Sequence, residues 1–237
     1  MRCCFAQQKK IFVIYYLMSV SSSIIFAQNM VDYRMFIDSA QTHSILYRGE
    51  FPPSYEKKGV HDRSTYFAYS VNFEKGNVIF RGKRYSDIYL NLDAHTDELY
   101  LREPVGGTYL LANKDLVDYF SVGSHKFIHY RQTKNSLLKN GYYEILYEGD
   151  AKLYKKIWKE YREEAVRHFI QGSFILSERF YLWRDNNWHA VDKKSDLLKL
   201  YAEQKILINN LLKTKKINFK RDKEYALIEI LTYLDNL

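Results

Sequence analysis

Short runs of alternating apolar and polar residues fill the middle of the chain, which is the pattern of antiparallel strands. Ile88, Leu90 and Leu92 lie at period two after a turn at Gly82. Because successive side chains of a strand point to opposite faces, these three share one face, and the pattern predicts the second strand of a hairpin. Further candidate strands are bounded by turn residues: 78–80, 99–101, 109–112, 119–122, 126–130, 142–147, 180–183 and 188–191.

Segment 152–164 fits two interpretations. Leu153, Ile157 and Tyr161 recur every four residues, which suits one face of a helix, whereas Gly149 and Asp150 just before them form a typical hairpin turn. We expect a strand at its start and helix or loop afterwards.

Beyond residue 193 the apolar residues change to three- and four-residue spacing, which predicts helices over 197–213 and 223–234, with Asp222 able to cap the second. The expected fold is therefore α+β: a mainly antiparallel sheet, open or curled, over 28–192, followed by a C-terminal helical hairpin over 193–237 that packs on it.

The first 27 residues have the layout of a secretory signal peptide. Arg2, Lys9 and Lys10 precede the apolar stretch 11–20, and Ala27 offers a small residue for cleavage. An uncleaved anchor is the alternative, but the stretch is shorter than the ~20 apolar residues that span a bilayer. We expect a mature chain that begins at or near Gln28 and keeps no transmembrane anchor.

Both cysteines, Cys3 and Cys4, lie in this leader, so the mature chain has none. That excludes disulfides, zinc–thiolate sites and cysteine nucleophiles. A hydrophobic content of 46% with 27% charged residues is ordinary for a globular domain, and a mean hydropathy of −0.43 excludes a polytopic membrane protein. A cysteine-free exported chain points to the periplasm, or to association with the outer membrane, of a Gram-negative bacterium.

Basic charge is concentrated near the C-terminus. Segment 213–223 carries six bases and one acid in a chain whose isoelectric point is about 9.2. Such a run attracts anionic surfaces, although charge runs often serve only solubility. Export argues against a nucleic-acid partner, so an envelope component or anionic surface is the expected partner. The anion-contact candidates are Lys213, Lys215, Lys216, Lys220, Arg221 and Lys223.

Asp93, His95 and Asp97 are the best candidates for a metal site, because a tight turn can direct alternate side chains toward one ion. Aspartates are also ordinary turn formers that bond their own backbone, so we expect no metal and no cofactor. His61 and Asp62 are adjacent in a loop and are candidates for a catalytic dyad.

Two further pairs fail on spacing. Glu144 and Glu148 suggest a glycosidase, and His125 and His129 suggest a metal pair, but residues four apart on a strand are ~13 Å apart. Glycosidase carboxylates lie within ~9.5 Å of each other. We therefore interpret the two glutamates as members of a solvated strand edge.

Short motifs in a recognisable order extend over nearly the whole mature chain. They are Leu46-Tyr-Arg-Gly49, the hairpin around Gly82 leading to Asp93, Tyr143-x-x-Leu146-Tyr-Glu-Gly149, Tyr181-Leu182 with Ala190-Val191, Lys193-Lys-Ser-Asp-Leu-Leu198, and Ile217-Asn-Phe-Lys220. With these motifs the chain resembles a family of uncharacterised exported proteins of Gram-negative bacteria. The resemblance implies export and a sheet followed by helices; it implies no activity and no site residues.

No complete catalytic motif is present in the sequence, and the basic segment is its most distinctive polar feature. The leading hypothesis is an exported, non-catalytic binding or envelope-interaction protein. The alternative is a periplasmic hydrolase acting on envelope or polysaccharide substrates. A cleft that brings at least two of Asp93, His95, Asp97, His61 and Asp62 within hydrogen-bond reach would favour the hydrolase.

Overall fold

The computed structural model describes residues 45–52, 64–134, 136–166 and 169–237. The chain divides into two units, Met1–Ile45 and Leu46–Leu237, and the fold described below is that of the second unit. The expected signal peptide, with its cleavage site after Ala27, lies outside the described residues.

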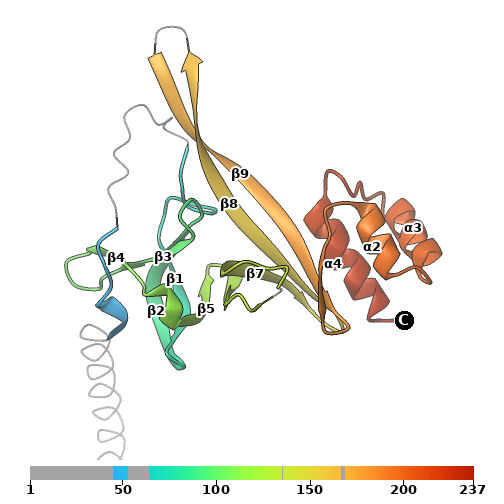
Figure 1. Cartoon of the computed structure of the whole chain (residues 1–237), viewed down its shortest axis with the longest axis horizontal. Coiled ribbons are helices and arrows are strands. Elements are labelled where there is room, and N and C mark those ends of the chain that lie inside the picture. Colours follow the sequence, from blue (N-terminus) through green and yellow to red (C-terminus); the bar gives the residue numbers. More distant parts are fainter. Residues whose placement is uncertain (1–44, 53–63, 135, 167–168) are drawn as a thin grey trace, which may run out of the picture. The chain divides into compact units, whose positions relative to one another are not determined.

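The second unit consists of a large sheet followed by helices (Figure 1). Its strands are β1 (Glu74–Phe80), β2 (Lys83–Asp93), β3 (Glu98–Arg102), β4 (Tyr109–Leu111), β5 (Val117–Val122), β6 (His125–Tyr130), β7 (Gly141–Glu148), β8 (Lys152–Val166), β9 (Phe169–Arg184) and β10 (Asn187–Ala190). The helices are α2 (Lys194–Leu200), α3 (Lys205–Thr214) and α4 (Lys223–Leu234), with short 3-10 turns at η1 (Ile45–Tyr47) and η2 (Lys114–Leu116).

All ten strands of the described residues form one antiparallel sheet in the order β10-β9-β8-β7-β6-β5-β1-β2-β3-β4. The sheet does not close on itself, because β10 and β4 remain as its two edges. A mainly antiparallel sheet followed by C-terminal helices confirms the α+β class that the alternating pattern predicted.

The hairpin of β8 and β9 is the longest pairing in the sheet. Its register runs without a break from Lys152 opposite Trp183 to Val166 opposite Phe169. The expectation of helix or loop after the start of β8 is therefore wrong. Residues four apart, such as Leu153 and Ile157, lie on the same face in a strand as well as in a helix, so their spacing fits both. The segment is a strand because it pairs with β9.

Three helices replace the expected pair, because the first expected helix is interrupted after Leu200. Tyr201 leaves helical geometry, with φ −120° and ψ 53°. Arg184 at the end of β9 donates a hydrogen bond to the carbonyl oxygen of Leu200 at 2.6 Å, and its guanidinium lies 4.1 Å from the centroid of the Tyr201 ring. A contact from the sheet thus takes up a carbonyl that a continuous helix would use itself.

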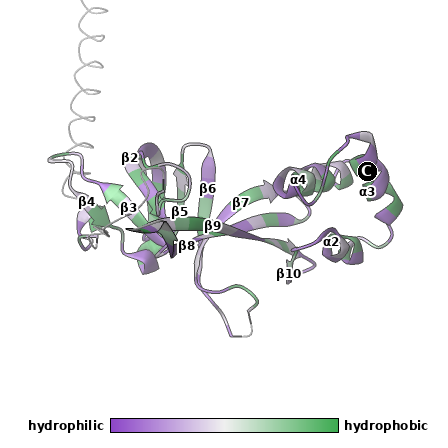
Figure 2. Cartoon of the chain, turned by 90° about the horizontal axis from the view of Figure 1, so that it is seen from above, coloured by the Kyte–Doolittle hydropathy of each residue, from purple (hydrophilic) through white to green (hydrophobic). Residues whose placement is uncertain are grey.

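Two main cores hold the unit together. One fills β1–β7 around Phe80, Leu90 and Phe120, and the other joins the helices to β8 and β9 through Leu153, Phe180 and a large set of helical apolar residues. The helices lie beside the end of the β8–β9 hairpin at which β8 begins and β9 finishes (Figure 1). Hydrophobic and hydrophilic residues alternate along them (Figure 2). The amphipathic spacing of the sequence is thus used to bury one side of each helix.

A third, aromatic cluster explains part of the count of 22 tyrosines. Tyr143, Tyr154 and Leu138 are buried together, and Trp188 makes an edge contact with Tyr154 at a ring-centroid distance of 5.2 Å. Tyr154 alternates with Leu153 along β8, so this cluster lies on the face of the sheet opposite the helices. Cross-strand aromatic pairs stabilise such a face.

Candidate functional site

A hollow of the second unit lies among the C-terminal helices. It has a volume of about 930 Å³, which is in the range that holds small ligands. Its lining comes from the residues before and at the start of α2, from α3, and from the connector between α3 and α4: Asp192, Lys193, Lys194, Asn209, Leu212, Lys213, Ile217, Asn218, Phe219, Lys220 and Lys223.

Local hydrogen bonds fix the connector that forms one wall. The Asn218 side-chain oxygen accepts from the backbone N–H groups of Lys220 and Arg221 at 3.0 and 3.2 Å, and its carbonyl accepts from the N–H of Asp222 at 2.8 Å. Asn218 thus closes a tight turn that leads into α4. The backbone that carries Lys220 and Lys223 is therefore held in one conformation.

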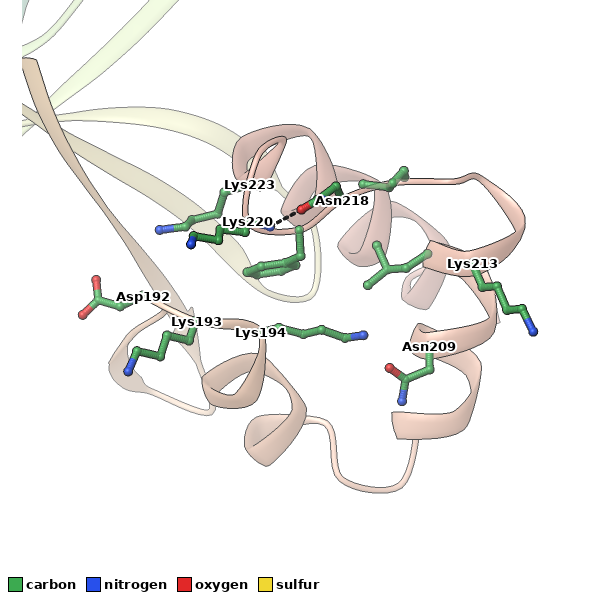
Figure 3. A pocket seen from close by; sticks show the side chains of 11 residues that line it. Asp192, Lys193, Lys194, Asn209, Lys213, Asn218, Lys220 and Lys223 are labelled. Atoms are coloured by element: carbon green, nitrogen blue, oxygen red, sulfur yellow. Dashed lines mark hydrogen bonds between the residues drawn. The ribbon is translucent and has the colours of Figure 1, made fainter.

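The start of α2 forms the opposite wall. Asp196 accepts a hydrogen bond from the backbone N–H of Lys193 at 2.9 Å, which satisfies a donor that the first turn of a helix leaves open. Lys193 and Lys220 lie with Lys223 and Asp192 at one end of the pocket, while Lys213 and Asn209 lie at the other end (Figure 3).

The charges around the pocket are unbalanced. Within the described part of the chain, none of the five lining lysines forms a salt bridge, and the carboxylate of Asp192 is paired with Arg179 at 3.2 Å. Five lysine side chains therefore line one hollow, and the pairing with Arg179 already partly neutralises its single acidic side chain. This arrangement favours an anion, because each added negative group reduces the repulsion among the lysines.

Beneath the lysines the lining is apolar. Leu212 and Phe219 are buried members of the helical core, and Ile217 packs against that core. Lys223 extends over the Phe180 ring, with its Nζ 5.5 Å from the ring centroid. The pocket thus combines a cationic border with a hydrocarbon floor that belongs to the core.

The six basic residues of the expected segment have three different surroundings. Lys213, Lys220 and Lys223 line the pocket. Lys215 forms an ion pair with Glu229, and Arg221 forms one with Asp222 at 2.9 Å. Hydrogen bonding to Glu229 raises the pKa of Lys215, and bonding to Arg221 lowers the pKa of Asp222.

Lys216 is exposed just beyond α3, with φ 54°, and does not line the pocket. Sequence reasoning missed Lys193 and Lys194, which lie some twenty residues upstream of the charge run. The signal that would have pointed to them is a lysine pair directly before a predicted helix.

The candidate metal ligands at the β2–β3 turn, where no metal was expected, have separate partners. Asp93 Oδ1 accepts from the backbone N–H groups of His95 and Thr96 at 2.7 and 3.1 Å, which is the ordinary turn function of aspartate. The His95 ring is bonded through Nδ1 to the carbonyl of Lys159 at 2.8 Å. No group of three or more His, Cys, Asp or Glu side chains among the described residues is arranged to hold a metal ion.

Asp97 serves a structural network instead. Its carboxylate pairs with Lys114 at 2.8 Å and with Lys156 at 2.6 Å, and it also accepts from the backbone N–H of Tyr142. Burial lowers the pKa of Lys156, and the charge of Asp97 opposes that shift. Gly141, at φ 151°, allows the close approach because a side chain there would collide with Asp97. His61 and Asp62, the candidate dyad, lie outside the described residues.

Glu144 corrects another expectation, because it is buried and not on a solvated edge. Its carboxylate accepts from Tyr69 Oη, from His125 Nδ1 at 2.5 Å and from Lys155 Nζ at 2.9 Å. Lys155 also donates to Glu224 of α4 at 2.6 Å. This network ties the sheet to the last helix.

His125 and His129 lie on β6, as predicted, and have different partners. His125 stacks on Tyr69 at a ring-centroid distance of 3.7 Å. His129 is held between the carbonyl of Val117 and the side-chain oxygen of Asn140, and burial lowers its pKa. The two rings do not share a site.

No family model, no protein of described function and no solved structure matches the chain. Among the residues that the structure describes, there is no helix with the length and apolar character needed to cross a membrane.

Proposed function

We propose that the chain is an exported, non-catalytic binding protein and that the lysine-bordered pocket is its binding site for an anionic ligand. The single observation that carries this proposal is a group of five lysines around one hollow that form no salt bridge with any residue that the structure describes. A Lys–carboxylate contact at an exposed site is worth only about 0.2–1 kcal/mol, so several must act together on one ligand. Three of the five lining lysines, Lys193, Lys220 and Lys223, lie at the same end of the pocket, so they can act together on one anionic group.

Export is supported by the charged, apolar and small-residue order of the first 27 residues, and by a mature chain without cysteine. Together with the resemblance to exported proteins of Gram-negative bacteria, this supports the periplasm or the outer membrane as the proposed site of action. The ligand is then an anionic envelope component.

Binding is favoured over hydrolysis by how the acid–base side chains are used. Asp93, His95 and Asp97 are each bonded to backbone or lysine partners within the fold. Among the described residues the pocket lysines form no salt bridge, and the remaining polar side chains of the lining are two asparagines and one aspartate. Such a set provides charge recognition and amide hydrogen bonds, without a nucleophile and base in one place.

The test is an NMR titration of the mature protein with inorganic phosphate at low salt, comparing two triple Lys→Gln variants. One removes lining lysines, Lys193, Lys213 and Lys220; the other removes exposed lysines that do not line the pocket, Lys199, Lys205 and Lys216. Both variants lose the same net charge, so the general field of the protein is matched.

We expect saturable shifts of the amides around the pocket in the wild type and in the control variant, and a loss of these shifts in the pocket variant. Phosphate affinity should fall as salt shortens the Debye length to ~8 Å near physiological ionic strength. Equal titrations by the two variants would refute the proposal, because they would reduce the lysines to a solubility role.

A further inference from the structure

The pocket is larger than a small anion, and its lining has more contact surface than such an anion can use. A bare phosphate or carboxylate group occupies a small part of a hollow of about 930 Å³. Its natural partners, the ammonium groups of Lys193, Lys220 and Lys223, lie at one end (Figure 3). The remaining lining must therefore contact some other part of the ligand.

That remaining lining is suited to hydrocarbon. Leu212, Ile217 and Phe219 belong to or pack against the helical core, so a chain lying on them would extend a core that already exists. Lys194 lies along the middle of the pocket, between the two ends (Figure 3). A lysine in this position covers apolar surface with its methylene groups and keeps its charge at the water boundary.

We infer that the ligand is a single-chain anionic amphiphile, with a carboxylate or phosphate head group at Lys193, Lys220 and Lys223 and a hydrocarbon chain on Leu212, Ile217 and Phe219. The inference rests on the proposed function, because it names the chemical class of the ligand for the same site. Asp192 lies at the head-group end, but its pairing with Arg179 reduces its repulsion of the head group. Lys213 at the far end is available to a second acidic group or to solvent.

The two parts of the ligand make different predictions. The charged head group makes the affinity depend on salt concentration, whereas the hydrocarbon chain makes the affinity depend on chain length. Burying one methylene group changes affinity by about fourfold when the group is fully removed from water. Affinity should therefore rise steeply with chain length until the floor is covered, and then level off.

The experiment measures calorimetric affinities for inorganic phosphate and for n-butyl, n-hexyl, n-octyl and n-decyl phosphate, each below its aggregation limit. A parallel series of the alkyl carboxylates separates phosphate from carboxylate head groups. Vesicles of phosphatidylglycerol, with and without an excess of octyl phosphate, separate a free amphiphile from a membrane surface.

We expect about a two- to fourfold gain for each added methylene, since the floor is only partly enclosed. Octyl phosphate should compete with any vesicle binding. A flat series, with phosphate binding still lost in the Lys193/Lys213/Lys220→Gln variant, would overturn the amphiphile and leave the proposed function standing. Octyl phosphate binding that is unchanged in that variant would overturn both.

Two variants test the floor without removing a buried core side chain. Ile217→Thr makes the floor more polar, and Asn209→Phe adds bulk at the far end of the pocket from a position on α3 that is only half-buried. Both should flatten the chain-length series while inorganic phosphate binds as to the wild type. An unchanged series in both variants would place the chain elsewhere and overturn the inference. Circular dichroism melts confirm that each variant is folded.

Discussion

Lys155 is the side chain whose replacement tests most directly how the sheet and the last helix are joined. Its side chain is only 5% exposed, and its ammonium lies 2.9 Å from Glu144 and 2.6 Å from Glu224. Burial alone would lower the pKa of Lys155, but the hydrogen bonds to Glu224 and Glu144 outweigh it and raise the pKa. The charged form is therefore favoured by the fold.

Lys155→Met keeps the length of the side chain and removes the charge. Glu224 remains 42% exposed and can be hydrated, whereas Glu144, at 4%, is left as a buried charge with only Tyr69 and His125 as donors. Breaking a buried pair in this way costs about 3–5 kcal/mol. Because two donors remain, we expect the low end, about 3 kcal/mol, or a fall in Tm of about 6–12 °C for a unit of this size.

The assay is denaturant unfolding followed by circular dichroism, with Lys152→Met as the matched control. Lys152 is an exposed lysine of the same strand, and its replacement should change stability by less than about 0.5 kcal/mol. The double variant Glu144→Gln/Lys155→Met removes both buried charges and should be more stable than Lys155→Met alone. Equal losses of unfolding free energy for Lys155→Met and the control would refute the reasoning. So would a double variant that loses at least as much as Glu144→Gln and Lys155→Met together, each measured alone.

Mass spectrometry of the protein recovered from the cell envelope should find an N-terminus at or near Gln28, and an intact Met1 would contradict export with cleavage. Melting temperatures should be the same with and without EDTA or a reductant, and a drop of several degrees with EDTA would point to a metal site. Stability should fall as the pH rises from about 10 to 12, because burial and then the charge of Glu103 raise the pKa of Tyr47 to about 12, so the unfolded chain loses its phenolic proton first. Denaturant melts at pH 8 to 11 test this, and constant stability over that range would contradict it.

The local pattern of apolar and polar residues predicted most of the sheet, because a strand with one buried face needs an apolar residue at every second position. It failed for the second half of β8, where a spacing of four is compatible with both a strand and a helix. The deciding contact is the pairing with β9, for example Tyr161 opposite Phe174, and no local pattern contains it. The break at Tyr201 has a similar origin, since it depends on Arg184 at the end of β9.

The candidate site was predicted only where its residues follow one another. Lys213, Lys220 and Lys223 belong to one charge run, but Lys193 and Lys194 join them only through the packing of α2 against the other helices. The sequence also could not show which lysines form ion pairs. Lys215 pairs with Glu229, whereas the lysines that line the pocket form no ion pair with the residues that the structure describes. The burial of Glu144 could not be predicted either, because its three hydrogen-bond donors come from β6, from β8 and from the segment before β1, which meet only in the folded sheet.

The strand order has a consequence for how the chain folds. Every neighbouring pair in the sheet is also consecutive in sequence, except for β1 with β5. Hairpins between consecutive strands form on a timescale of about 1–10 μs, and such local pairings keep the contact order low. The joining of β1 to β5 must first close the intervening chain through β4, at an entropic cost that grows only with the logarithm of loop length. We therefore expect two meanders, β1–β4 and β5–β10, to assemble early, and the seam between β1 and β5 to set the folding rate.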